Sequence, residues 1–359
     1  MTISPESWQK MFFLGPEDKK WANAPADAKP PQQGWKNEWK VWLPAAQAAK
    51  KPEEDSELKD NHVLKLNEQQ KLYARPHVRL QAALAFKVLK NAPQLTKEEA
   101  ELTAAKLKTE LRKIAYGVDK EDETTVTVAE AFGNVATANR EAHCKSDNNP
   151  TKPLSVLAAL SCICGKAAAS DEEKVCGRHI TARNTWTQAS RNQNEGDMRS
   201  IGKTCGKGKP KPITSVDIRT ALALVQHRIK VIGSDGFFGT VKSGTDCTGA
   251  NNAAICVKLA NFGSAPEVAE QALPWLGKLK EIADTLESRE RKLRTRKAAL
   301  AQLKQAEEAI TKTIYAAGNI QQMQTTVSAV QPPEKKDGSA KECDAIQTAA
   351  ECRKNGNCK

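Results

Sequence analysis

Apolar residues recur at helical spacing near the end of the chain, and they predict one long helix from about Pro266 to Gln324. Leucines stand seven apart at first, and the apolar stripe then shifts phase. Heptad spacing keeps one side of a helix turned toward a partner helix, so we predict a coiled coil within the chain, between chains, or both. Roughly 55 residues at 1.5 Å each would span about 80 Å. The seam comprises Leu279, Leu286, Leu293, Leu300, Leu303 and Ile310.

Two details modify this long helix. Pro274 lies close to its start and has no backbone N–H to donate, so the first turns are expected to be kinked or separate. Arg289 and Arg296 occupy alternate positions of the seam. Parts of the seam are therefore expected to be hydrated or salt-bridged.

Earlier in the chain, residues 61–90 predict a helix with an apolar stripe of Leu72, Leu80, Leu84, Val88 and Leu89. Pro76 inside it predicts a kink. Thr96 and Glu99 form a capping box, which opens a second helix that Gly117 is placed to end.

The remaining chain predicts shorter elements. Trp35, Trp39 and Trp42 lie on one face of a short helix and are expected to pack against a larger helix. Residues 125–142 and 153–163 are short helical candidates, and 216–232 has helical apolar spacing. Residues 233–250 are rich in Gly, Ser and Thr and predict a loop.

Composition favours helices packed through Leu and Ala, because aromatic residues make up only 5% of the 359 positions. The net charge of +12 raises the question of nucleic acid, but basic and acidic residues interleave along most of the chain. One local concentration, Lys203, Lys207, Lys209 and Lys211, lies among Gly and Pro and predicts an exposed loop. We therefore expect no nucleic-acid partner.

The ten cysteines are unevenly placed: none in residues 1–143, seven between Cys144 and Cys256, and three in the tail. Clustered cysteines are typical of disulfides in an oxidising environment. No signal-peptide core and no long apolar run accompany them. Both groups are odd in number, so we expect a chain cut at each end, with Met1 an internal residue. A Pro/Lys/Gly linker at 331–342 precedes the tail cysteines and predicts a second small domain that holds Cys343, Cys352 and Cys358.

Among the seven central cysteines, Cys247 and Cys256 enclose a short Gly/Asn/Ala segment. Closing that loop would stabilise the fold by roughly 2.5–3 kcal/mol. Cys162 and Cys164 are two apart on a helix, point to different faces and need different partners. The remaining pairings are expected to be Cys164 with Cys176, Cys162 with Cys205, and Cys144 with a partner upstream of Met1.

No constellation supports catalysis or a cofactor. Residues 196–204 resemble a phosphate loop, but five residues separate the glycines instead of four. Cys176 and His179 have a zinc-like spacing near Cys162, Cys164 and His143-Cys144, without a completing pair. No G-x-S-x-G or H-E-x-x-H segment occurs, so neither an enzyme nor a metal site is expected. No N-x-S/T site occurs, and Ser234, Ser243 and Thr245 are candidates for O-linked sugar.

Three groups of residues resemble the variant surface glycoproteins of trypanosomes. Residues 1–8 (MTISPESW), with Gly34-Trp35-Lys36, Trp39 and Trp42-Leu43, resemble the early part of a class B amino-terminal domain. The segment from Leu154 to Gly165, with Cys162 and Cys164, resembles its mid-chain Leu/Cys-rich part. The tail resembles the opening of the carboxy-terminal domain through Lys341-Glu342-Cys343-Asp344, Glu351-Cys352 and Asn357-Cys358-Lys359.

The resemblance implies a mainly α fold: an elongated helical bundle on a long antiparallel coiled-coil hairpin, with a disulfide-stapled, loop-rich head built from parts of 145–255. It implies an amino-terminal domain over 1–330, a linker over 331–342, and the start of a cysteine-rich domain over 343–359.

In function, the resemblance implies a coat glycoprotein on the extracellular face of the plasma membrane. It would be held by a glycosylphosphatidylinositol anchor outside this sequence. It would shield invariant proteins sterically and be replaced during antigenic variation. Expected partners are a second copy (a trimer is also possible) and host antibodies. The alternatives are a related surface receptor for a host serum protein and, outside this class, an intracellular zinc or nucleic-acid binder.

Overall fold

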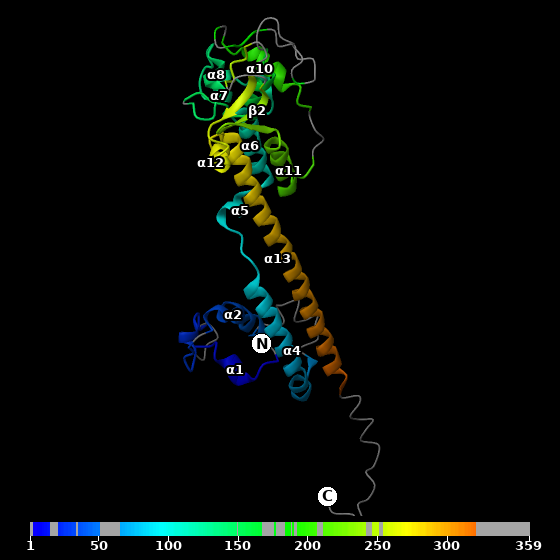
Figure 1. Cartoon of the computed structure of the whole chain (residues 1–359). Coiled ribbons are helices and arrows are strands. Elements are labelled where there is room, and N and C mark those ends of the chain that lie inside the picture. Colours follow the sequence, from blue (N-terminus) through cyan, green and yellow to red (C-terminus); the bar gives the residue numbers. More distant parts are fainter. Residues whose placement is uncertain are drawn as a thin grey trace, which may run out of the picture. The chain divides into compact units, whose positions relative to one another are not determined.

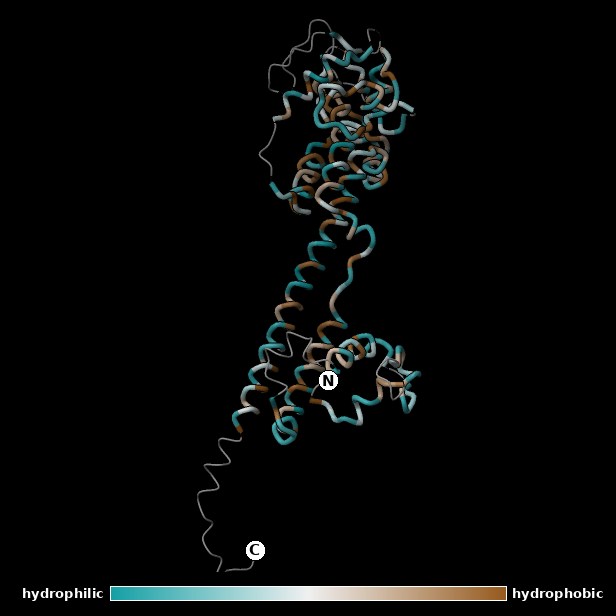
Figure 2. The backbone as a smooth tube through the Cα atoms, turned by 180° about the vertical axis from the view of Figure 1, so that it is seen from behind, coloured by the Kyte–Doolittle hydropathy of each residue, from teal (hydrophilic) through white to brown (hydrophobic). Residues whose placement is uncertain are grey.

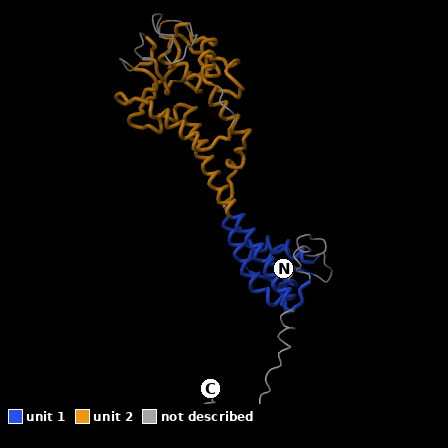
Figure 3. Tube along the Cα trace, turned by 90° about the vertical axis from the view of Figure 1, so that its right-hand side faces the viewer, with its two compact units in different colours: residues 1–92, 299–359 blue, residues 93–298 orange. Residues whose placement is uncertain are grey.

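The part of the chain that the structure describes is mainly helical, with one long helix, a small sheet and three disulfides, which confirms the predicted fold class. A computed structural model (Figure 1) describes residues 3–14, 21–33, 35–50, 65–148, 150–166, 176, 184–187, 189, 192–206, 211–241, 246–250 and 254–320. The chain divides into two compact units (Figure 3). Unit 1 comprises Met1–Ala92 with Ala299–Lys359, and unit 2 comprises Pro93–Ala298. The predicted linker at 331–342 and the tail cysteines lie outside the described residues.

Unit 1 begins with an aromatic cluster around two helices, α1 (Glu6–Lys10) and α2 (Lys36–Lys50), and the short 3-10 helix η1 (Pro25–Asp27). Trp39 on α2 is 1% exposed, stacks on Phe12 at 4.4 Å, and donates from its indole N–H to the carbonyl of Ala22 at 2.7 Å. Trp42 meets Trp8 edge-on at 5.4 Å. The tryptophans of α2 therefore pack against the preceding chain.

The other part of unit 1 is α4 (Glu68–Asn91) against the final turns of α13 (Pro274–Gly318). Asn67 caps α4 in a capping box with Gln70, and Gln70 donates to the carbonyl of Gly318 at 3.0 Å. The start of α4 thus lies beside the end of α13, so the two helices run antiparallel (Figure 1). Their shared cluster contains Ile3, Leu66, Ala74, Ile314 and Ala317.

The apolar stripe expected for α4 does not pack against α13 and is largely exposed. Leu72, Leu80 and Leu84 are 63%, 58% and 49% exposed, whereas Ala74 is buried and Val78 is partly buried. The helix carries two apolar faces, and periodicity alone does not choose between them. Small Ala74 faces α13 because it permits close helix approach. Helix α4 continues through Pro76.

Unit 2 opens with α5 (Lys97–Glu101) and α6 (Ala104–Tyr116). Thr96 and Glu99 form the predicted capping box, and Gly117 ends α6 at a φ of 85°, as expected for a left-handed cap. The expected single helix is split, because Thr103 caps a new start. The following elements are η3 (Glu123–Thr125), α7 (Val128–Phe132), α8 (Arg140–His143), α9 (Val156–Cys164), α10 (Glu195–Gly202) and α11 (Ser215–Gln226).

A three-stranded antiparallel sheet follows α11, with strand order β1-β2-β3. The strands are β1 (Ile229–Ile232), β2 (Asp235–Val241) and β3 (Ala254–Leu259). The expected helix over 216–232 therefore ends early, and part of the expected loop over 233–250 is strand. Gly233 turns the chain at a φ of 63°, and Ile229 then pairs with Phe238. Gly and Thr in β2 obscure the strand pattern, while Phe237 is fully buried.

The long helix is broken near Pro274, as expected: α12 (Pro266–Gln271) precedes the 45-residue α13. The predicted seam is only partly covered. Leu286 is 5% exposed and Leu279 packs against the core, but Leu293 and Leu300 are 41% and 55% exposed. Leu303 is half-buried, and Ile310 packs against the cluster of unit 1. Along α13 hydrophilic and hydrophobic residues alternate closely (Figure 2). Among the described residues, no helix is both long and apolar enough to cross a membrane.

Candidate functional site

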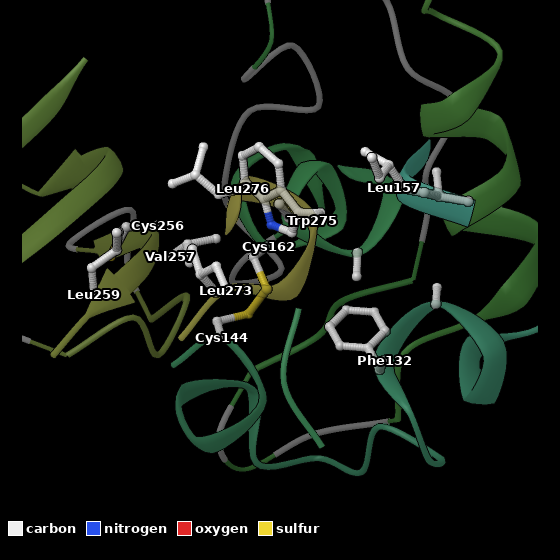
Figure 4. Packing of buried hydrophobic residues seen from close by; sticks show 14 of the residues in the cluster. Phe132, Cys144, Leu157, Cys162, Cys256, Val257, Leu259, Leu273, Trp275 and Leu276 are labelled. Carbon is white, nitrogen blue, oxygen red and sulfur yellow. A yellow bond between two sulfur atoms is a disulfide. The ribbon is translucent and has the colours of Figure 1, made fainter. Parts of the chain in front are cut away.

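The most tightly organised part of unit 2 surrounds α9 and the sheet. Its core brings together Phe132, Leu157, Val257, Leu259, Leu273, Trp275 and Leu276 (Figure 4). These residues come from α7, α9, β3 and the α12–α13 junction. Three disulfides lie in the same region.

The two cysteines of α9 bond to different partners, as their spacing requires. Cys164 bonds to Cys176, and Cys162 bonds to Cys144 (Figure 4). The expected pairing of Cys162 with Cys205 is therefore wrong, and Cys144 needs no partner upstream of Met1. Cys205 lies exposed just after α10. Cys144 reaches α9 because α8 ends directly before it.

Cys247 bonds to Cys256 on β3, as expected for two cysteines that enclose a short segment. Strand β3 is also tied to the first disulfide. The amide of Lys258 donates to the carbonyl of Cys144 at 2.8 Å, and the amide of Ser146 donates to the carbonyl of Lys258 at 2.9 Å. The Cys144–Cys162 bridge therefore joins the end of α8 to α9, and backbone hydrogen bonds join Cys144 to β3. Together α8, α9 and β3 are called the cross-linked layer.

Arg140 is the central polar group of this layer and is fully buried. Its guanidinium donates to the carbonyls of Cys162 at 2.7 Å and Trp186 at 2.9 Å. It also lies over the Trp186 ring at 5.2 Å. A buried cation requires dense hydrogen bonding, and the planar guanidinium supplies several donors at fixed angles. Arg140 therefore fixes the end of α9 against the chain that leads to Trp186.

Gly249 lies against this arginine. Its φ is 69°, and an added Cβ would stand 2.6 Å from the Arg140 guanidinium. A side chain at this position would collide with the buried cation as well as strain the backbone. Gly249 is thereby fitted directly against the Arg140 side chain.

His143 is also buried but shows no catalytic arrangement. Its Nε2 accepts from the amide of Thr137 at 3.0 Å, and burial lowers the pKa of the ring. Desolvation disfavours the charged imidazolium, so this histidine is held neutral as a structural acceptor.

Zinc would need free cysteine ligands, and Cys162, Cys164, Cys144 and Cys176 are all in disulfides. His179 lies outside the described residues, within which no cluster of metal-binding side chains occurs. Of the candidate sugar sites, Ser234 is exposed at the turn between β1 and β2, and Ser243 and Thr245 lie outside the described part of the chain.

Polar contacts also fasten α5 and α11 to α13. Glu99 is 4% exposed and accepts from the Lys292 ammonium at 2.6 Å. This bond, together with one to Ser288, lowers the pKa of Glu99 to about 2. Ser215, at the start of α11, donates from its amide and hydroxyl to Glu290 at 3.0 and 2.7 Å. Sequence reasoning identified Glu99 only as part of the capping box and missed these contacts with α13, because no local motif predicts a contact between residues so far apart in the chain.

Comparison with known proteins agrees with this architecture. The family model described as "Trypanosomal VSG domain" matches residues 1–305. Variant surface glycoprotein ILTAT 1.23 of Trypanosoma brucei brucei is 27% identical over 295 residues, which cover 77% of this chain and 53% of that protein. The chain thus spans about half the length of this curated relative. Because the model match covers far more than half of the residues, the chain belongs to the family of the trypanosomal variant surface glycoprotein (VSG) domain.

Proposed function

We propose that this protein is a surface coat glycoprotein of a trypanosome that shields invariant surface proteins by steric coverage and takes part in antigenic variation. The observation that carries the proposal is the family match over residues 1–305. Steric shielding requires a stable exposed body and no catalytic group.

The cross-linked layer of unit 2 supports such a role. A disulfide and Arg140 hold α8 and α9 together, and backbone hydrogen bonds attach β3, so these contacts do not involve the side chains that face outward. Exposed positions of this unit include Val135, Val216, Leu224 and Val231. Surface substitutions away from special contacts usually change stability by less than about 0.5 kcal/mol. A body of this kind tolerates a changing outer surface, which antibody evasion requires.

Attachment to the extracellular face of the plasma membrane is part of the proposal. We assign residues 1–330 to the amino-terminal domain, 331–342 to a linker, and 343–359 to the start of a cysteine-rich domain. A glycosylphosphatidylinositol anchor would follow beyond this sequence. Ser234, Ser243 and Thr245 are the proposed acceptors of O-linked sugar.

A second copy of the chain is the proposed partner of α4. The face centred on Leu80 also carries Leu72, Tyr73 and Leu84, all exposed. On a helix these positions gather on one side, opposite Ala74 and Val78. Contiguous exposed apolar surface of this kind marks an interaction site. Pairing of the α4 faces in a homodimer would bury it, and a trimer would use the same face.

A single charge on that face tests the homodimer. Leu80→Glu is expected to yield a monomer in sedimentation equilibrium, because pairing would bury an unpartnered carboxylate. Leu224→Glu, at a 64% exposed position of α11, is the matched control and is expected to leave the dimer intact. A dimer that survives Leu80→Glu would exclude this face and leave the coat role untouched.

The coat role itself is tested on live cells. Antibodies raised against the recombinant chain are expected to stain intact trypanosomes that express it uniformly and without permeabilisation. They are expected to lose their target when the cells switch coats. Staining confined to permeabilised cells would overturn the surface location. Recovery of one saturable serum protein by the recombinant chain would instead favour the receptor alternative.

A further inference from the structure

Helix α13 carries a dense basic segment, most of which neither the fold nor the proposed coat role uses. Six of the ten residues from Ser288 to Lys297 are Arg or Lys, and Glu290 is the one acid among them. The six are Arg289, Arg291, Lys292, Arg294, Arg296 and Lys297. All belong to unit 2. Such a density departs from the interleaved charges of the rest of the chain.

The acidic groups near this segment are already committed. Glu99 binds Lys292, and Glu290 accepts from Ser215. One turn earlier, Asp284 and Glu287 both bind Arg219 of α11. None of these carboxylates forms a salt bridge with Arg291, Arg294 or Lys297 in the described part of the chain.

Three of those cations form a ridge. Arg291, Arg294 and Lys297 stand three apart on α13, and all three are exposed. Residues three apart on a helix are surface neighbours, about 5–6 Å between Cβ atoms. Within the part of the chain that the structure describes, none of the three side chains makes a salt bridge. Like charges held this close repel one another, and an external polyanion would relieve that repulsion.

We propose that the ridge of Arg291, Arg294 and Lys297 binds a sulfated glycosaminoglycan. Guanidinium groups match the planar oxygens of a sulfate with paired hydrogen bonds. A linear polyanion that lies along α13 would meet the three cations in turn. Arg296 lies across the helix from Arg294 and adds to the positive field.

The absence of aromatic residues favours a glycan over a nucleic acid. No Phe, Tyr or Trp occurs between Trp275 and Tyr315 in the sequence. Proteins that bind single-stranded nucleic acid combine basic grooves with aromatic rings on which bases stack. This stretch of α13 offers charge without an aromatic side chain of its own, which suits a sugar chain.

Heparin supplies the test, with binding of the full chain measured by calorimetry at several salt concentrations. The triple variant R291Q/R294Q/K297Q is expected to bind heparin roughly tenfold or more weakly at about 0.15 M salt. The slope of log K against log salt is expected to fall by about 2–3, because three ionic contacts are lost.

The control variant K108Q/K304Q/K312Q removes the same charge from exposed lysines of α6 and α13. It is expected to retain the heparin affinity and the slope. Circular dichroism verifies that both variants are folded. Three results would overturn the proposal: equal loss in the control variant, equal affinity for desulfated heparin, or tighter binding of single-stranded DNA of matched charge. None of them bears on the coat role, which the live-cell staining tests separately.

Discussion

The two units of this protein are held together by different means. In unit 2, a disulfide and the buried Arg140 join α8 to α9, and backbone hydrogen bonds join Cys144 to β3. The described residues of unit 1 contain no cysteine, and they depend on an aromatic cluster and on the pairing of α4 with α13.

This difference bears on the surfaces that each unit exposes. Unit 2 exposes apolar residues at several places, among them Val135, Val216 and Val231. In unit 1, by contrast, α4 presents a continuous apolar face that its own chain leaves uncovered in the described residues. Unit 2 is thus cross-linked covalently between the end of α8 and α9, whereas the described part of unit 1 is held by non-covalent packing. Four measurements test this contrast, in order of decreasing expected effect.

The largest effect is expected from Trp39→Ala in unit 1. Trp39 fills the centre of the aromatic cluster and donates a buried hydrogen bond, so its loss is expected to destabilise unit 1 by about 3–5 kcal/mol. Hydrogen exchange of peptides from α2 is expected to accelerate, while peptides from α9 stay protected. Trp35→Ala, at a 42% exposed position, is the control with a small effect. Equal loss of protection in α9 would show that the units do not pack independently.

A smaller effect, confined to unit 2, is expected from removal of the bridge between α8 and α9. The double variant C144S/C162S opens a loop with a sequence separation of 18 and is expected to cost about 3 kcal/mol on the chain-entropy model. Urea unfolding, monitored through hydrogen exchange of peptides from α9, measures this loss of stability. Cys205→Ser, at an exposed position, is expected to change little. If C144S/C162S has the same urea midpoint as wild type, this disulfide does not stabilise unit 2. The contrast between the units would then not come from the covalent cross-link.

Lowering the pH is expected to weaken the contact between α5 and α13, because Glu99 becomes protonated. Its pKa in the fold is about 2, against 4.5 for the unperturbed group. The folded state therefore holds this carboxylate ionised where the unfolded chain takes up a proton. This contribution to stability is present above about pH 4.5 and is lost as the pH falls toward 2. Glu99→Gln is expected to be less stable than wild type at pH 7, and the gap in urea midpoint is expected to narrow below pH 4.5. A gap independent of pH would mean that Glu99 acts through packing instead of charge.

The smallest effects are expected from helix caps, one in each unit. Asn67 accepts from the amide of Gln70 at the start of α4, and Thr103 accepts from the amide of Lys106 at the start of α6. Either change to Ala is expected to cost about 1 kcal/mol. Asn67→Ala should accelerate exchange in α4 alone and Thr103→Ala in α6 alone. Faster hydrogen exchange in the unit that does not carry the substitution would argue against two separate bodies.

Much of the helical framework could be predicted from local signals. The capping box at Thr96, the end of α6 at Gly117 and the break before Pro274 all depend on neighbouring residues. The sheet could not, because β2 is interrupted by Gly236 and Gly239 and gains its stability from pairing with β1 and β3. The seam of α13 predicts a continuous contact, but Leu293 and Leu300 remain exposed within the described chain.

The sequence by itself determined the helical class, the long terminal helix and the concentration of cysteines, because caps, helical periodicity and composition act over a few residues. Only the tertiary structure decided that Cys162 bonds to Cys144, that Arg140 is enclosed by carbonyls, and which face of α4 meets α13. Each of these depends on which distant segments meet. That choice is made by the packing of whole elements, which local patterns do not encode.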